Sequence, residues 1–242
     1  MTAVPAARLS RAYGPFLLLV AWLVAIKLAI LGGPPVFRSP AQAAVFAWPF
    51  LGVVLVAGLG GVWLSRRIGI PDLLAVDIAP RHRFLAPVII GWALGLAMLG
   101  SDWGFDWSLP MALGHGLPSI HIPFPASLLI YPGGAIIVCV IYYLVPIPLL
   151  TWLLSRGVWR GRHQARAFWI AGLLCAAIEP LTQDLTPSMR ALGGVGALVF
   201  VLDYAANAAQ VVVFRNAGFL AAVTLRITFY LVWHVVPSLG VG

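Results

Sequence analysis

The chain contains a single glutamate, and that glutamate lies inside an apolar stretch. Glu179 ends the run AFWIAGLLCAAIE and is followed directly by proline. An ionisable group at membrane depth is costly, so such residues mark candidate functional sites. A carboxylate sheltered in this way can act as a general base when it lies within reach of a water molecule. Glu179 is therefore the first candidate for chemistry, and its predicted role is to activate water.

Two later apolar segments carry polar stripes at helical spacing. Asp203, Asn207 and Gln210 follow an i, i+4, i+7 pattern, which places the three side chains on one helical face. A second stripe repeats every four residues and consists of Arg226, Tyr230 and His234. Polar stripes in such apolar segments normally face the interior of a bundle or a water-filled cavity.

The segment of Glu179 carries a third stripe, because Gln183 follows the glutamate by about one helical turn. Proline at position 180 disfavours helical geometry at the preceding residue, so we expect the Glu179 carboxylate at a helix end or kink. The functional interpretation of the three stripes is a wet cavity in which Glu179 and His234 activate a water molecule.

A structural interpretation fits the same residues. In this alternative Asp203 and Arg226 form an ion pair between two helices, while Asn207 and Gln210 donate and accept hydrogen bonds across the bundle. The aromatic and imidazole side chains near the C-terminus would then form an interfacial belt. The sequence leaves both interpretations open.

The elements that would position these residues are membrane-spanning helices. Hydrophobic residues make up 62% of the chain and charged residues 9%, whereas a soluble domain has about 25% charged residues. A helical span needs about 20 mostly apolar residues, and seven such stretches can be placed, at 15–31, 45–64, 86–100, 133–154, 167–183, 192–213 and 218–237. Six or eight spans also fit, since Pro146 and Pro148 could break the fourth stretch. The predicted fold is an all-α polytopic integral membrane bundle that forms one domain over residues 1–242.

The net charge of +8 is distributed as membrane topology requires. With a cytoplasmic N-terminus, Arg38 and Arg190 lie outside, and Lys27 and Arg226 lie within spans. The other eleven of the fifteen basic residues lie inside, namely Arg8, Arg11, Arg66, Arg67, Arg81, Arg83, Arg156, Arg160, Arg162, Arg166 and Arg215. This distribution follows the positive-inside rule. We therefore predict the lipid bilayer as partner, no nucleic-acid partner, and a location in the plasma (inner) membrane.

The connecting segments carry secondary candidates. The aromatic outer loop 101–125 is expected to lie on the outer leaflet. Its residues of metal-binding type match no spacing typical of a metal site; they are Asp102, Asp106, His115 and His121. On the inner side, residues 70–80 are expected to form a short amphipathic helix with Asp72 as its N-cap. Cys139 and Cys175 are expected to be small buried side chains.

The C-terminal segment GFLAAVTLRITFYLVWHVVPS, residues 218–238, resembles the last conserved helix of the CAAX protease and bacteriocin-processing (CPBP) family. These proteins are multi-pass intramembrane endopeptidases with three motifs, Glu-Glu-x-x-x-Arg, Phe-x-x-x-His and His-x-x-x-Asn. The third motif is matched in part by His234-Val-Val-Pro-Ser238, which has serine in place of asparagine.

The other two motifs are altered. Cys175-Ala-Ala-Ile-Glu179 has glutamate where the second motif has histidine. The first motif aligns with Val138-Cys139-Val-Ile-Tyr-Tyr143, which has neither the paired glutamates nor the arginine. The resemblance covers residues 131–238.

The resemblance implies hydrolysis of a peptide bond within the membrane, in a membrane protein or a lipidated peptide. Glu179 would activate water, and His234 would ligate a metal or stabilise the oxyanion. A metal ion, zinc by preference, would be held by Glu179 and His234. The supporting residues would be Asp203, Asn207, Arg226 and Gln183.

Because two of the three motifs are altered, the resemblance also fits a member that binds such a partner without cleaving it. A non-catalytic scaffold or accessory subunit is the main alternative. A small transporter that uses the midplane carboxylates is another, although no inverted repeat is evident in the sequence.

Overall fold

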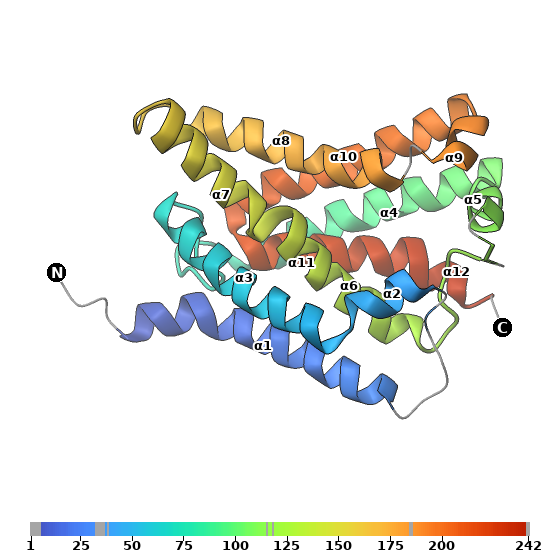
Figure 1. Cartoon of the computed structure of the whole chain (residues 1–242), viewed down its shortest axis with the longest axis horizontal. Coiled ribbons are helices and arrows are strands. Elements are labelled where there is room, and N and C mark those ends of the chain that lie inside the picture. The colour runs from blue at the N-terminus through green and yellow to red at the C-terminus, as the bar shows by residue number, and fades with distance from the viewer. Residues whose placement is uncertain are drawn as a thin grey trace.

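The computed structural model is a bundle of long helices that lie side by side (Figure 1). It describes residues 6–31, 37, 39–114, 116–117, 119–183 and 186–240, with side chains from residue 12 onward except at position 41. In this part of the chain, seven helical stretches are long and apolar enough to cross a membrane: Ala12–Leu31, Trp48–Arg67, Arg81–Phe105, Ser127–Val158, Gln164–Gln183, Gly194–Ala217 and Phe219–Ser238. The predicted all-α polytopic bundle is confirmed.

The spans are built from α-helices and short π-helical turns. The long helices are α1 (Ala6–Leu31), α3 (Trp48–Arg67), α4 (Ala86–Phe105), α6 (Ser127–Cys139), α7 (Pro146–Trp152), α8 (Gln164–Gln183), α10 (Gly194–Ala217) and α11 (Phe219–Tyr230). The π-helical turns are η1 (Arg81–Leu85), η2 (Val140–Leu144), η3 (Leu153–Val158) and η4 (Leu231–Val235). Short helices complete the chain: α2 (Pro40–Val45), α5 (Ser108–Gly114), α9 (Pro187–Ala191) and α12 (Val236–Ser238).

The two prolines of the fourth span do not divide it. Pro146 is the first residue of α7, a position whose N–H would have no helical partner in any case. The turn η2 leads into it with a hydrogen bond from Val145 N to Val140 O at 3.1 Å. One continuous span therefore runs from α6 through η2 and α7 to η3.

Helix α11 lies at the centre of the bundle and contacts α4, α6 and α10. Glycines on α4 allow the closest of these approaches. A Cβ atom added at Gly91 would lie 2.5 Å from the Leu225 carbonyl oxygen, and one added at Gly95 would lie 2.7 Å from Val232 Cβ. The polar stripe on α11 is consequently enclosed by neighbouring helices, while α1 is the least buried span.

The expected amphipathic helix at residues 70–80 is wrong, since this segment forms turns. The Asp72 carboxylate binds Arg66 Nε at 3.0 Å, at the end of α3, and does not cap a helix. The Ala75 carbonyl accepts a hydrogen bond from Arg83 Nη2 of η1. These long side chains fix the segment as a turn against the ends of two spans.

Candidate functional site

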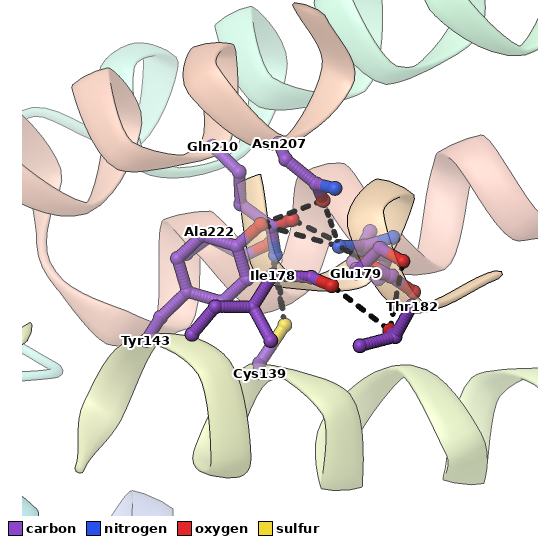
Figure 2. Close-up of polar contacts among 9 residues, drawn as sticks. Cys139, Tyr143, Ile178, Glu179, Thr182, Asn207, Gln210 and Ala222 are labelled. Atoms are coloured by element: carbon purple, nitrogen blue, oxygen red, sulfur yellow. Dashed lines mark hydrogen bonds and ion pairs between the residues drawn. The ribbon is translucent and has the colours of Figure 1, made fainter. Parts of the chain in front are cut away.

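Arg226 is the centre of a buried polar network between four helices, and Figure 2 shows its partners converging on one point. Its Nη2 donates to the Glu179 carboxylate at 2.7 Å and to the Tyr143 hydroxyl at 3.2 Å. The same nitrogen donates to Asn207 Oδ1. Its Nε donates to Gln210 Oε1 at 3.0 Å. The network therefore joins η2, α8 and α10 to α11.

The outer members of this network also bond to one another, while Nδ2 of Asn207 has no hydrogen-bond partner among the described residues. The Tyr143 hydroxyl donates to Asn207 Oδ1 at 2.7 Å. Gln210 Nε2 donates to the Ala222 carbonyl at 3.0 Å and to Cys139 Sγ at 2.8 Å. Tyr143, Asn207 and Gln210 are almost wholly buried. Buried charges are tolerated when they are paired and hydrogen-bonded in this way.

The ion pair of Arg226 is with Glu179 (side chains 2% and 7% exposed). We expected Asp203 as the partner, so the pair links α11 to α8 and not to α10. Asn207 and Gln210 do bond across the bundle, as the structural interpretation anticipated.

Glu179, which the sequence predicts at a helix end or kink, lies about one turn before the end of α8. Helix α8 continues through Pro180 to Gln183. The Thr182 hydroxyl donates to the carbonyls of Ile178 at 2.8 Å and of Glu179 at 2.9 Å. Both bonds link the Thr182 side chain to the preceding turn of α8, which carries Glu179.

A cavity of about 340 Å³ adjoins the network. Five of the six predicted site residues line it: Glu179, Gln183, Asp203, Arg226 and His234. Asn207 is fully buried and does not line it. The wall is largely apolar and includes Phe46, Met98, Trp107, Ile122, Val199, Phe229 and Trp233. On α6 the lining residues Ile130, Gly134 and Val138 repeat every four positions, so one helical face forms this side.

His234 is held at the cavity by other rings. It stacks on Tyr131 with a centroid distance of 4.3 Å and an interplanar angle of 3°. Its Nδ1 lies 3.3 Å from Nδ1 of His121, a residue of the loop that precedes α6. His121 is 4% exposed, and burial lowers its pKa from the usual 6.5 to about 4. His121 is therefore neutral at pH 7.

This histidine pair could not be predicted from the sequence, because 113 residues separate its members. Spacing identifies neighbours within a helix, whereas a contact between a loop and a distant helix depends on the whole arrangement. We had considered His121 only as one residue of a metal-binding type in the outer loop.

The residues present do not favour a metal ion between Glu179 and His234. Among the described residues, no group of three or more histidine, cysteine, aspartate and glutamate side chains could hold one. A guanidinium at 2.7 Å from Glu179 Oε2 opposes a second cation at that carboxylate. In the outer loop, Asp102 accepts hydrogen bonds from the Ser108 backbone at 2.7 Å and its hydroxyl at 2.8 Å. His115 lies outside the described residues.

No family model matches the chain, and neither a curated protein nor a solved structure matches it. The function is therefore argued from the network and the cavity. The chain is a multi-pass membrane protein with seven candidate spans in its described part.

Proposed function

We propose that this chain is a CPBP-like membrane protein that binds a segment of a membrane protein or a lipidated peptide in the cavity without hydrolysing it. The observation that carries the proposal is the ion pair between Glu179 and Arg226. A general base must lie within hydrogen-bond reach of the water that it deprotonates, with an oxygen free to accept the proton. In this protein Oε2 of Glu179 accepts from Arg226 Nη2 at 2.7 Å, so this oxygen serves a buried arginine as counter-ion and is not free for that role.

The helix aligned with the first family motif supports the same conclusion. Residues 127–158 contain no aspartate or glutamate. Cys139 and Tyr143 occupy this side of the network, where they contribute a thiol and a hydroxyl group. At the positions aligned with the first motif, Cys139 and Tyr143 therefore accept hydrogen bonds from Gln210 and Arg226. They add no second carboxylate that could act as base.

The cavity has the composition of a binding site for an amphipathic partner. Its volume of about 340 Å³ lies in the range of ligand pockets. Polar groups gather along α8, α10 and α11, while aromatic and aliphatic side chains form the remaining wall. A short peptide segment with apolar side chains or an acyl chain would place its backbone against the polar groups of α8, α10 and α11. Its apolar part would then contact the aromatic and aliphatic wall. Under this proposal the N-terminus is cytoplasmic and the cavity lies towards the outer leaflet.

The test uses the full chain in lipid nanodiscs and a library of fluorescent acylated peptides. Gly134 lines the cavity, and a Cβ atom there meets nothing within 4 Å. Gly134→Phe therefore fills the cavity without a steric clash at the backbone. Gly52→Phe is the matched control, because Gly52 lies on an exposed face of α3 with equally open space.

We expect a peptide to bind the wild type and Gly52→Phe with the same affinity, and to bind Gly134→Phe at least tenfold more weakly. Equal affinity for all three proteins would contradict the proposed site. Hydrolysis that is lost in Glu179→Gln would support the enzymatic alternative in its place.

A further inference from the structure

The position of one proton in the His121–His234 pair determines whether His234 presents a hydrogen-bond donor to a ligand in the cavity. The two Nδ1 atoms lie 3.3 Å apart, so one of them donates and the other accepts. His121 is neutral at pH 7, and a neutral imidazole carries one N–H group. The tautomer of His121 therefore selects the tautomer of His234.

The surroundings of His121 settle its tautomer. Its Nε2 is buried and has no hydrogen-bond partner. An N–H group at this atom would be a buried donor without an acceptor, which is rare and costly in folded proteins. The proton of His121 consequently lies on Nδ1 and is donated to Nδ1 of His234. His234 then carries its own proton on Nε2.

Two donor groups on the cavity wall remain unused within the described part of the chain. No hydrogen bond of the described residues uses Nε2 of His234 or Nη1 of Arg226. Both residues line the cavity. They lie eight residues apart on one continuous helical run, which corresponds to roughly 12 Å at 1.5 Å per residue.

We infer that the cavity binds a peptide backbone through two carbonyl acceptors, one at Arg226 Nη1 and one at His234 Nε2, and that His121 is a positioning residue which fixes the donor tautomer of His234. This inference rests on the proposed function. A lipid head group with a single ester carbonyl cannot accept from both donors. An extended peptide can, since it presents a carbonyl group on the same edge at every second residue.

The role of His121 is tested without any ligand, by ¹⁵N NMR of histidine-labelled protein in detergent micelles. We expect His121 protonated on Nδ1 and His234 protonated on Nε2. His121→Asn retains a donor close to the position of Nδ1, so the His234 signal should not change. His121→Phe removes the donor, and the His234 proton should then exchange between both nitrogens. A His234 ring protonated on Nδ1 in the wild type would overturn the assignment.

The ligand class is tested with an octanoyl pentapeptide amide, which has same-edge carbonyls four residues apart, and with analogues in which one amide is replaced by an alkene, which lacks the acceptor. We expect tenfold or weaker binding when an engaged carbonyl is removed. His121→Phe should weaken binding of the amide by a similar factor, and His121→Asn should restore it. Equal affinities for amide and alkene would overturn the two-carbonyl inference. If the amide does not bind the wild type at all, the proposed function and the ligand class both fail, whereas the NMR result still decides the role of His121.

Discussion

At the scale of single residues, the central feature is a charge pair that is balanced by hydrogen bonds. Glu179 is the sole glutamate of the chain, and Arg226 gives it a cationic partner at the cavity wall, where both side chains are more than nine-tenths buried. Nε of the guanidinium also donates to Gln210, and its Nη2 donates to Tyr143 and Asn207. Removal of either charge leaves the other buried and unpaired.

We predict that Arg226→Met lowers the free energy of unfolding by about 3–5 kcal/mol, because it leaves the Glu179 carboxylate without its partner. The double variant with Glu179→Leu should recover much of this loss, since neither charge then remains. The measurement is denaturant unfolding in detergent. Arg67→Met is the control, because Arg67 stacks on the half-exposed Trp63 at a span end. A cost for Arg226→Met as small as that of the control would contradict the network.

The buried His121 makes stability depend on pH. Its pKa is about 4 in the folded chain and 6.5 when unfolded, so between these values the unfolded chain binds a proton that the folded chain does not. Stability should therefore fall as the pH falls from 6.5 towards 4, by up to about 3 kcal/mol at about 1.4 kcal/mol for each unit. His234 is the titratable group in contact with it.

The measurement for His121 is thermal unfolding in detergent from pH 7 to pH 4, compared with His121→Asn. The wild type should lose more stability over this window than the variant, which lacks the titrating ring. Parallel curves for the two proteins would show that His121 titrates normally.

At the scale of elements, close helix packing sets the position of the polar stripe. Gly91 and Gly95 allow α4 to approach α11 and η4 on the face that carries Leu225, Thr228, Phe229 and Val232, and this packing fixes the helix on which Arg226 lies. A side chain at either glycine would separate the helices and loosen the cavity wall.

We predict that Gly91→Ala destabilises the protein by about 1–3 kcal/mol, because its Cβ atom would lie 2.5 Å from a backbone oxygen of α11. Gly100→Ala on the same helix is the matched control. A Cβ atom there meets nothing within 4 Å, so alanine should stabilise the helix by up to about 1 kcal/mol. Unfolding in detergent distinguishes the two, and equal effects would argue against the close approach of α4.

The spans and one cavity-lining helical face could be predicted from the sequence, and the two wrong predictions have local physical causes. Apolar length identified the spans, and the spacing of Arg226 and His234 identified one lining face. The segment 70–80 was misassigned because the bonds that hold it come from Arg66 and Arg83, outside the segment. Asp203 was predicted as the ion-pair partner of Arg226 and the partner is Glu179, because helical spacing does not say which neighbouring helix a side chain faces.

At the scale of the whole molecule, the start of α1 and helix α12 lie at opposite ends of the bundle (Figure 1), as expected for an odd number of spans such as the seven candidates among the described residues. The distribution of arginine predicts that the loop between η3 and α8 is cytoplasmic and that the loop before α6 is external.

The orientation is tested by cysteine labelling in intact cells. Arg162→Cys should react with a membrane-impermeant maleimide only after permeabilisation, whereas Ser119→Cys should react before it. The native thiols Cys139 and Cys175 are buried and should give little background. The reverse pattern would place the N-terminus outside.

Under the proposed function, the cavity beside the ion pair of Glu179 and Arg226 binds a peptide and does not cleave it. The most direct test measures both properties in one sample. The wild type in nanodiscs is incubated with the acylated peptide library, and bound and free peptides are then identified by mass spectrometry. The account predicts that peptides are retained at their full mass by the wild type and are not retained by Gly134→Phe. Cleaved peptides from the wild type and intact ones from Glu179→Gln would contradict it.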